Sequence, residues 1–341
     1  MPEHRPSRAA APRPPSSRGA LVLSLAGVAF GVIALGCGGG FDGGGGGGGG
    51  AAGEGPGRRS QELALSPYEE LALGRKAFAE VKSQSEVLPE GRPEYRRVRD
   101  VAGGIIHQFQ ANDPLRREIN LHLKDPRGED WQFEWDYAVL HKDEVNAFCL
   151  PGGKIAVYTG LLEFVDKGEG DKDNAKLATV LSHEIAHALA HHANERIARG
   201  GMADQAMAWA AGQTLGDEDR LLLGKLMGAG TALADRGPDR GPDPDVLAGV
   251  AGKLGELAFD RRQEAEADHI GVFLMTFAGY DPDAAVRFWE DMAGRSKGHI
   301  PEILSDHPSD TRRVANLREW AARAKEALAA YKAGRIAPAG K

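Results

Sequence analysis

The spacing of hydrophobic and polar positions predicts a helix, then a small sheet, then a mainly helical body. Residues 66–81, SPYEELALGRKAFAEV, place apolar side chains at helical spacing behind Ser66, which can cap a helix, and Pro67, which suits its first turn. The runs 131–140 and 154–160 are rich in aromatic and β-branched residues and predict strands, the second of them after the turn sequence LPGG. Beyond this second strand helical patterns dominate.

Two segments lack any such pattern. Residues 38–57, GGGFDGGGGGGGGAAGEGPG, cannot bury a core and predict a flexible tether. Its root-mean-square length is roughly 25 Å, from about 5–6 Å times the square root of the number of residues. The sequence DRGPDRGPDPD at 235–245 predicts a loop within the helical body.

The order of elements predicts an α+β fold with one catalytic domain. We expect that domain to span residues 61–335, after a signal segment at 1–37 and the glycine-rich tether at 38–60. No internal repeat is visible in the sequence.

Composition narrows the class of protein. The chain has 341 residues, and its hydrophobic content of 42% is sufficient for a sizeable core. With 42 Lys and Arg against 49 Asp and Glu, the net charge is -7 and no basic block occurs, so we expect no nucleic-acid partner. The two cysteines, Cys37 and Cys149, are too few for a disulfide framework. We interpret Cys149 as a small buried residue rather than a nucleophile.

The first 37 residues have the features of an export signal. Four arginines precede the uncharged apolar run 19–36, and IALGC resembles a bacterial lipobox in which Cys37 receives a lipid. The alternative is an uncleaved transmembrane anchor, because this run approaches the roughly 20 residues that span a bilayer. Either anchor predicts a domain held at a membrane in the cell envelope, on the periplasmic side. Gly38, in place of an Asp, favours the outer membrane of a two-membrane bacterium.

The sequence LSHEIAHALAHH at 181–192 contains His183, Glu184 and His187 in the pattern H-E-x-x-H. On a helix the two histidines lie about 6 Å apart along the axis, so both imidazoles can reach one ion. Zinc accepts imidazole nitrogens and makes a water molecule more acidic, and Glu184 is placed to remove the proton. The motif arises by chance in roughly a few per cent of chains of this length, and the alternative is a histidine-rich surface helix.

A third ligand has to come from another residue. His191 continues the spacing, but it lies about 12 Å along a helix from His183, too far to share one tetrahedral ion. We therefore expect His191 and its neighbour His192 at the surface or behind the ligands.

A distant acidic segment offers that ligand. In FDRRQEAEADHIG, at 259–271, Glu264 and Asp268 are four residues apart on one helix face, and Glu266 is predicted on the opposite side. This spacing suits Glu264 as a ligand and Asp268 as the acceptor for the outer nitrogen of a zinc-bound histidine. Taken alone, the segment also fits a solvated acidic face.

Several motifs together resemble one family. SHEIAHALAHH, RRQEAEAD and SDHPSDTRRVANL occur in the order typical of the zinc metallopeptidases of the CAAX prenyl protease, HtpX and BepA type. EELALGRKAF, VNAFCLPGGKIAVYTGLL and AGYDPDAAVRFWEDM extend the resemblance from about Pro67 to Leu317. Two features depart from the family: Cys149 stands where Ala is usual, and 235–245 resembles an insertion.

The resemblance implies a mostly helical, zincin-like metallopeptidase domain with a small β-sheet beside the H-E-x-x-H helix. It implies one Zn²⁺ per chain, of the gluzincin type. The implied ligands are His183, His187 and Glu264, with Glu184 as the base and Asp268 behind a ligand.

Further site residues follow from the same resemblance. Asn146, Ala147 and Phe148 fall in the strand segment beside the active-site helix, where an exposed edge would bind an extended peptide; an ordinary core hairpin is the alternative. SDHPSDTRR brings His307 near the cleft, either as a fourth zinc ligand that restrains the resting enzyme or as a catalytic group that stabilises the oxyanion, with helix capping as the structural alternative. Arg313 is a second oxyanion candidate.

Two functions of different classes remain open from the sequence. The first is a membrane-tethered zinc endopeptidase that hydrolyses unfolded or misassembled envelope proteins. The second is a chaperone-like protein that binds such clients while its protease activity is latent or blocked. The presence of Glu184 favours the enzyme, because a binding module has no need of a base.

Overall fold

The computed structural model of the chain describes residues 51–54, 60–228, 233, 261–295 and 312–335, all of them in the compact unit Gly47–Lys341. Its sheet has three strands, β3 (Asp136–Leu140), β4 (Ala147–Leu150) and β5 (Lys154–Tyr158), in the order β3-β5-β4. β3 runs parallel to β5, and β4 runs antiparallel to it. The LPGG sequence turns the chain between β4 and β5, where two glycines have φ angles of 70° and 85° that other residues rarely adopt.

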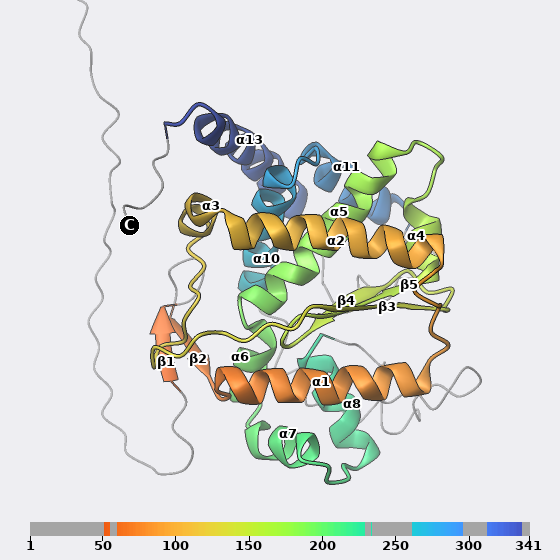
Figure 1. Ribbon diagram of the computed structural model, residues 1–341, viewed down its shortest axis with the longest axis vertical. Coiled ribbons are helices and arrows are strands. Elements are labelled where there is room, and N and C mark those ends of the chain that lie inside the picture. The colour runs from red at the N-terminus through yellow and green to blue at the C-terminus, as the bar shows by residue number, and fades with distance from the viewer. Residues whose placement is uncertain (1–50, 55–59, 229–232, 234–260, 296–311, 336–341) are drawn as a thin grey trace, which may run out of the picture. The chain divides into compact units, whose positions relative to one another are not determined.

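Helices cover both faces of this sheet (Figure 1). On one face, side chains such as Val139, Cys149 and Val157 pack into a core with α2 (Pro93–Ala111) and α5 (Asp171–Leu189). On the other face, their sequence neighbours pack into a second core with α1 (Pro67–Gln84). Because both faces are covered, β4 and β5 are buried at every position, which explains why all of their residues except Lys154 at the start of β5 are apolar or aromatic.

The remaining elements enclose this centre. A two-stranded antiparallel hairpin precedes α1, and further helices follow α2 and β5. No helix in these described ranges is long and apolar enough to cross a membrane. The bounds are β1 (Ala51–Glu54), β2 (Ser60–Leu63), α3 (Asp113–Glu118), α4 (Thr159–Val165), α6 (His192–Arg199), α7 (Ala203–Ala210), α8 (Asp217–Leu226), α10 (Arg261–Phe277), α11 (Asp283–Arg295) and α13 (Arg313–Lys332).

The predicted α+β class and the first helix are confirmed. α1 begins with Pro67, and Ser66 caps it in a reciprocal arrangement with Glu69, whose carboxylate accepts a hydrogen bond from the Ser66 backbone N–H at 2.8 Å. The segments 1–37 and 235–245, for which we predicted an export signal and a loop, lie outside the described residues.

Both predicted strands were too long. Residues 131–135 are not in a strand, because Trp131 and Phe133 pack against the ring of His191 on the α6 side of the protein. The run 154–160 leaves the sheet at Tyr158, since α4 begins at the next residue. The first five residues of one run and the last two residues of the other therefore lie outside the strands.

The close packing of two helices, α5 and α10, brings the candidate site residues together. α5 packs against α10, and a Cβ atom added at Gly271 of α10 would lie only 3.0 Å from the backbone nitrogen of His183 in α5. Gly271 is three residues after Asp268 and seven after Glu264, so all three lie on one face of α10. The glycine therefore allows the acidic face of α10 to approach the histidines of α5 closely.

We predict that Gly74→Ala lowers the free energy of unfolding by at least about 1–3 kcal/mol, because the added methyl group would overlap the carbonyl oxygen of Pro151 in the β4–β5 turn. Chemical denaturation of the full-length protein measures the change. Gly104→Ala is the matched control: this helical glycine is exposed and has no neighbouring atom within 4 Å, so the same substitution should be neutral or stabilising by up to about 1 kcal/mol. Equal stability of the two variants would contradict the predicted overlap.

Candidate metal centre

Two of the clustered side chains come from one turn of α5. His183 and His187 are 3% and 5% exposed, and their Nε2 atoms lie 3.1 Å apart. The second half of α5 is buried throughout, from Leu177 to its last residue. The alternative of a histidine-rich surface helix is therefore wrong.

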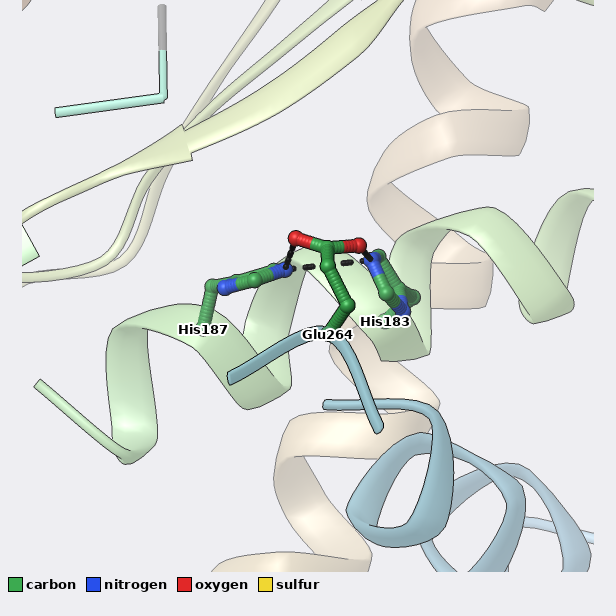
Figure 2. A group of neighbouring side chains, drawn as sticks. All are labelled: His183, His187 and Glu264. Carbon is green, nitrogen blue, oxygen red and sulfur yellow. Dashed lines mark hydrogen bonds and ion pairs between the residues drawn. The ribbon is translucent and has the colours of Figure 1, made fainter. Parts of the chain in front are cut away.

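Glu264 reaches the same point from α10 (Figure 2). Its Oε2 atom lies 3.4 Å from Nε2 of His183, and its Oε1 atom lies 3.3 Å from Nε2 of His187. The three potential ligand atoms lie within 4.8 Å of one another, and no other such cluster occurs among the residues that the structure describes. Two imidazole nitrogens and a carboxylate oxygen are ligands that zinc prefers, so these residues fit a zinc ion.

The outer nitrogen of His183 faces a buried carboxylate. Its Nδ1 atom lies 2.9 Å from Oδ1 of Asp268. Burial opposes a charge on this imidazole, but hydrogen bonds with Asp268 and Glu264 outweigh it and raise the pKa of His183 to about 9. The carboxylates of Asp268 and Glu264 therefore favour a positive charge at the position of His183. For His187, burial is the strongest influence and lowers the pKa well below its ordinary value, so this imidazole is neutral and able to bind a metal.

Arg313 holds Asp268 in turn. Its Nη2 atom donates a hydrogen bond of 2.8 Å to Oδ1 of Asp268, and its Nε atom lies 2.7 Å from Oδ2. The guanidinium lies 3.4 Å from the ring centre of Trp289, an arrangement that restricts its movement. Burial raises the pKa of Asp268, but Arg313 and His183 lower it by more than burial raises it. The pKa of Asp268 therefore lies below its ordinary value. Asp268 is therefore an anionic acceptor for His183.

The outer nitrogen of His187 faces His192, for which a position behind the ligands was one of the two expectations. Nδ1 of His192 lies 2.8 Å from Nδ1 of His187, and Nε2 of His192 lies 3.0 Å from Oε2 of Glu266. We had predicted Glu266 on the side of α10 away from the site, and placement of His192 at the surface was one option. Both residues are buried, because the start of α6 meets the start of α10, where Gln263 also donates a hydrogen bond of 2.7 Å to Glu195.

His191 is buried as well, which excludes a surface position for it. Its Nδ1 atom lies 3.0 Å from the carboxylate of Glu70, and its ring stacks on Trp131 with the centres 3.4 Å apart. The residue has a φ angle of 55°, a left-handed conformation that costs a residue other than glycine about 1–3 kcal/mol. The contacts of its side chain offset that cost.

Glu184 is 2% exposed and follows His183 on α5. Burial raises the pKa of the Cys149 thiol well above its ordinary value, and the negative charge of Glu184 raises it further, so this carboxylate lies toward β4. The predicted burial of Cys149 is confirmed, and its lack of reactivity stays a prediction.

The predicted substrate strand is only partly as expected. β4 pairs with β5 alone among the described strands, so it has the position of an edge strand. Asn146, Ala147 and Phe148 are at most 2% exposed, because α5 and α1 pack on this strand. His307 and Cys37 lie outside the described residues, and their roles stay predictions.

Comparison with known proteins agrees with the donor set. The family model described as peptidase family M48 matches residues 116–321, a range that includes all four of His183, Glu184, His187 and Glu264. This chain belongs to peptidase family M48. The members of this family are zinc-dependent, in agreement with the predicted cofactor.

Relatives of this M48 chain include proteases from eukaryotes and bacteria. It is 34% identical over 336 residues to the mitochondrial metalloendopeptidase OMA1 of Arabidopsis thaliana, covering 81% of this chain and 61% of the relative. It is 27% identical to the protein of the same name in Saccharomyces cerevisiae, covering 79% of this chain and 68% of the relative. The β-barrel assembly-enhancing protease of Escherichia coli is 29% identical over 196 residues, 54% of this chain and 34% of the relative. The chain thus spans about three fifths of the plant relative.

We predict that Glu264→Ala loses zinc, because two imidazoles alone leave the ion with too few protein ligands. Metal analysis after dialysis of the purified full-length protein should give one zinc per wild-type chain and much less than one per variant chain. Glu118→Ala, which removes an exposed carboxylate of α3, is the control and should keep its zinc. Stoichiometric zinc in Glu264→Ala would contradict the ligand assignment.

Proposed function

We propose that the chain is a zinc-dependent endopeptidase. The observation that carries this proposal is the convergence of Nε2 of His183, Nε2 of His187 and the carboxylate of Glu264, with Glu184 next to the first histidine on α5. A base beside a buried set of metal ligands has a purpose in hydrolysis, whereas a structural metal site has no use for one.

Each of these residues has its own proposed role in hydrolysis. His183, His187 and Glu264 would hold one zinc ion, which supplies a Lewis acid that polarises a peptide carbonyl and acidifies water. The carboxylate of Glu184 takes a proton from the attacking water and gives it to the nitrogen of the departing amine. Asp268 accepts a hydrogen bond from Nδ1 of His183 and so directs Nε2 toward the metal position.

For Arg313, the contacts favour a positioning role over direct stabilisation of the oxyanion. Its guanidinium is buried, pairs with Asp268 through two nitrogens and lies on Trp289. To reach a reacting carbonyl, Arg313 would have to break its ion pair with Asp268. We therefore propose that Arg313 keeps Asp268 anionic and correctly oriented, and that His307 remains the candidate for restraint or oxyanion stabilisation.

We propose unfolded or misassembled proteins of the cell envelope as substrates. An extended peptide would pair with the edge of β4 that no described strand occupies, beside α5, because backbone hydrogen bonds give affinity with little sequence preference. The side chains of Asn146–Phe148 are buried because α5 and α1 pack on the strand, so a peptide would contact the strand through backbone groups at its edge. The names of the relatives, a β-barrel assembly-enhancing protease and mitochondrial metalloendopeptidases, support a protease of membrane-bounded compartments.

The second candidate is a chaperone-like protein whose hydrolytic activity is latent. The burial of Asn146, Ala147 and Phe148 is the observation that favours it, since a strand whose side chains are covered suits a blocked cleft. The two candidates differ in whether the purified protein turns over an unfolded substrate.

We predict that Glu184→Gln keeps one zinc per chain but slows hydrolysis of casein by several orders of magnitude, because the amide preserves shape and cannot accept the proton. Full-length protein in detergent should be used, with zinc measured in the same sample. Glu118→Gln, an equivalent change at an exposed position of α3, should leave the rate unchanged. Near-normal turnover in Glu184→Gln would assign the base to another residue, and absent turnover in the wild type would favour the chaperone.

We also propose that a lipid on Cys37 tethers the domain to a membrane. In a two-membrane bacterium this would be the outer membrane. Cys37→Ser should abolish metabolic labelling with a fatty acid, because serine lacks the thiol that accepts the lipid. Cys149→Ala, which removes the other cysteine, should label like the wild type. Equal labelling of Cys37→Ser and wild type would contradict the lipid anchor.

A further inference from the structure

The two histidines that face the metal position are oriented in different ways. His183 presents its Nδ1 atom to a carboxylate, that of Asp268. His187 presents its Nδ1 atom to a second imidazole, that of His192, at 2.8 Å. A metal-binding histidine needs a fixed partner on its outer nitrogen, because that partner decides which nitrogen carries the proton and how the ring is turned.

A break in the helix is required for this contact. On a continuous helix a residue five positions after His187 would point away from it, since each residue turns the helix by about 100°. Here α5 ends at Leu189, His191 takes a left-handed conformation, and α6 begins at His192. The reversal brings the imidazole of His192 back against the ring of His187, and the two ring centres are 4.9 Å apart.

The reversal is itself held by contacts from the N-terminal part of the domain. The carboxylate of Glu70, in α1, lies 3.0 Å from Nδ1 of His191 and accepts a hydrogen bond of 2.9 Å from Nδ2 of Asn194. The side-chain oxygen of Asn194 accepts from the backbone N–H groups of Ala64 and Leu65. The start of α6 is therefore fixed from two directions.

Glu266 completes the chain of contacts on the far side of His192. Its Oε2 atom lies 3.0 Å from Nε2 of His192, and both side chains are buried. One assignment of protons satisfies every pair. Nδ1–H of His187 donates to Nδ1 of His192, and Nε2–H of His192 donates to Glu266, which leaves Nε2 of His187 as a lone-pair donor toward the metal position.

We infer that His192, anchored by Glu266, is a positioning residue that sets the tautomer and ring orientation of His187 for metal binding. The inference rests on the proposed zinc site and deepens it. α10 then supports both histidines, directly through Asp268 and indirectly through Glu266, while its Glu264 completes the ligand set.

Three variants of the full-length protein test this inference. His192→Phe keeps a buried ring but removes both hydrogen bonds. His192→Gln offers an amide oxygen to His187 and an N–H group to Glu266, so it is the conservative variant. His269→Phe is the matched control, because His269 is a half-buried histidine of the same helix α10 that packs on Phe273 and Trp320.

Zinc affinity is measured by competition with a chelator, and the visible spectrum of the Co²⁺-loaded protein reports the ligand geometry. We expect His192→Phe to weaken zinc binding by about 10- to 100-fold and to change the Co²⁺ spectrum. His192→Gln should restore most of the affinity and the wild-type spectrum, and His269→Phe should match the wild type. Wild-type affinity and spectrum in His192→Phe would overturn the inference, as would an equal loss in His269→Phe.

Glu266→Leu provides a second route if His192→Phe does not fold. This change leaves the His192–His187 contact in place but removes the anchor of His192, so zinc affinity should fall several-fold with an altered Co²⁺ spectrum. An unchanged affinity and spectrum would overturn the inference. The proposed function has a separate failure: if the wild-type protein binds no zinc at all, the zinc site is wrong, whereas strong wild-type binding with no effect of these variants contradicts only the role of His192.

Discussion

A carboxylate buried between two imidazoles is the constraint on which the centre of this protein depends. Glu264 is 5% exposed and lies between Nε2 atoms of His183 and His187 that are 3.1 Å apart. Removing a charge from water costs several kcal/mol unless an opposite charge compensates it, and Arg313, which pairs closely with Asp268, comes only within 3.8 Å of Glu264. A divalent cation between these three side chains would supply that compensation, and metal binding and the packing of α5 against α10 would then stabilise each other.

The geometry around this cation position follows from two local features of the backbone. Gly271 lets α10 approach His183 within contact distance, which brings Glu264 and Asp268 to the histidines. The left-handed His191 ends α5 and returns the chain, which brings His192 to His187. The first feature positions ligands by close packing, and the second positions a supporting residue by reversing the direction of the chain.

These features differ in how far the sequence predicts them. Helical periodicity places His183 with His187, and Glu264 with Asp268, on one face of their own helix, since residues four positions apart share a face. That the two pairs meet at one metal site is what the family resemblance implied. The contact of His192 with Glu266 joins residues 74 positions apart and depends on the conformation of His191, which helical spacing does not predict. Two adjacent histidines after H-E-x-x-H, together with a third acid between Glu264 and Asp268, were the available signals.

The small sheet shows the same limit of local patterns. The residues of 131–135 have strand-forming side chains, yet Trp131 packs on His191, because the ring of the residue before α6, and none of the described strands, lies next to it. Likewise, the position of β4 at the edge of the sheet is consistent with peptide binding, but the packing of α5 and α1 buries Ala147 and Phe148. Tertiary neighbours, which a local pattern does not contain, decide both cases.

The most direct measurement is anomalous diffraction at the zinc absorption edge from crystals of the purified protein. We expect one strong peak per chain, about 2.0–2.2 Å from Nε2 of His183, Nε2 of His187 and a carboxylate oxygen of Glu264. Such a peak would place the ion on the cluster that α5 and α10 form. A zinc-loaded protein with no peak at these three atoms, or with its peak at another group of residues, would contradict the assignment of the metal centre.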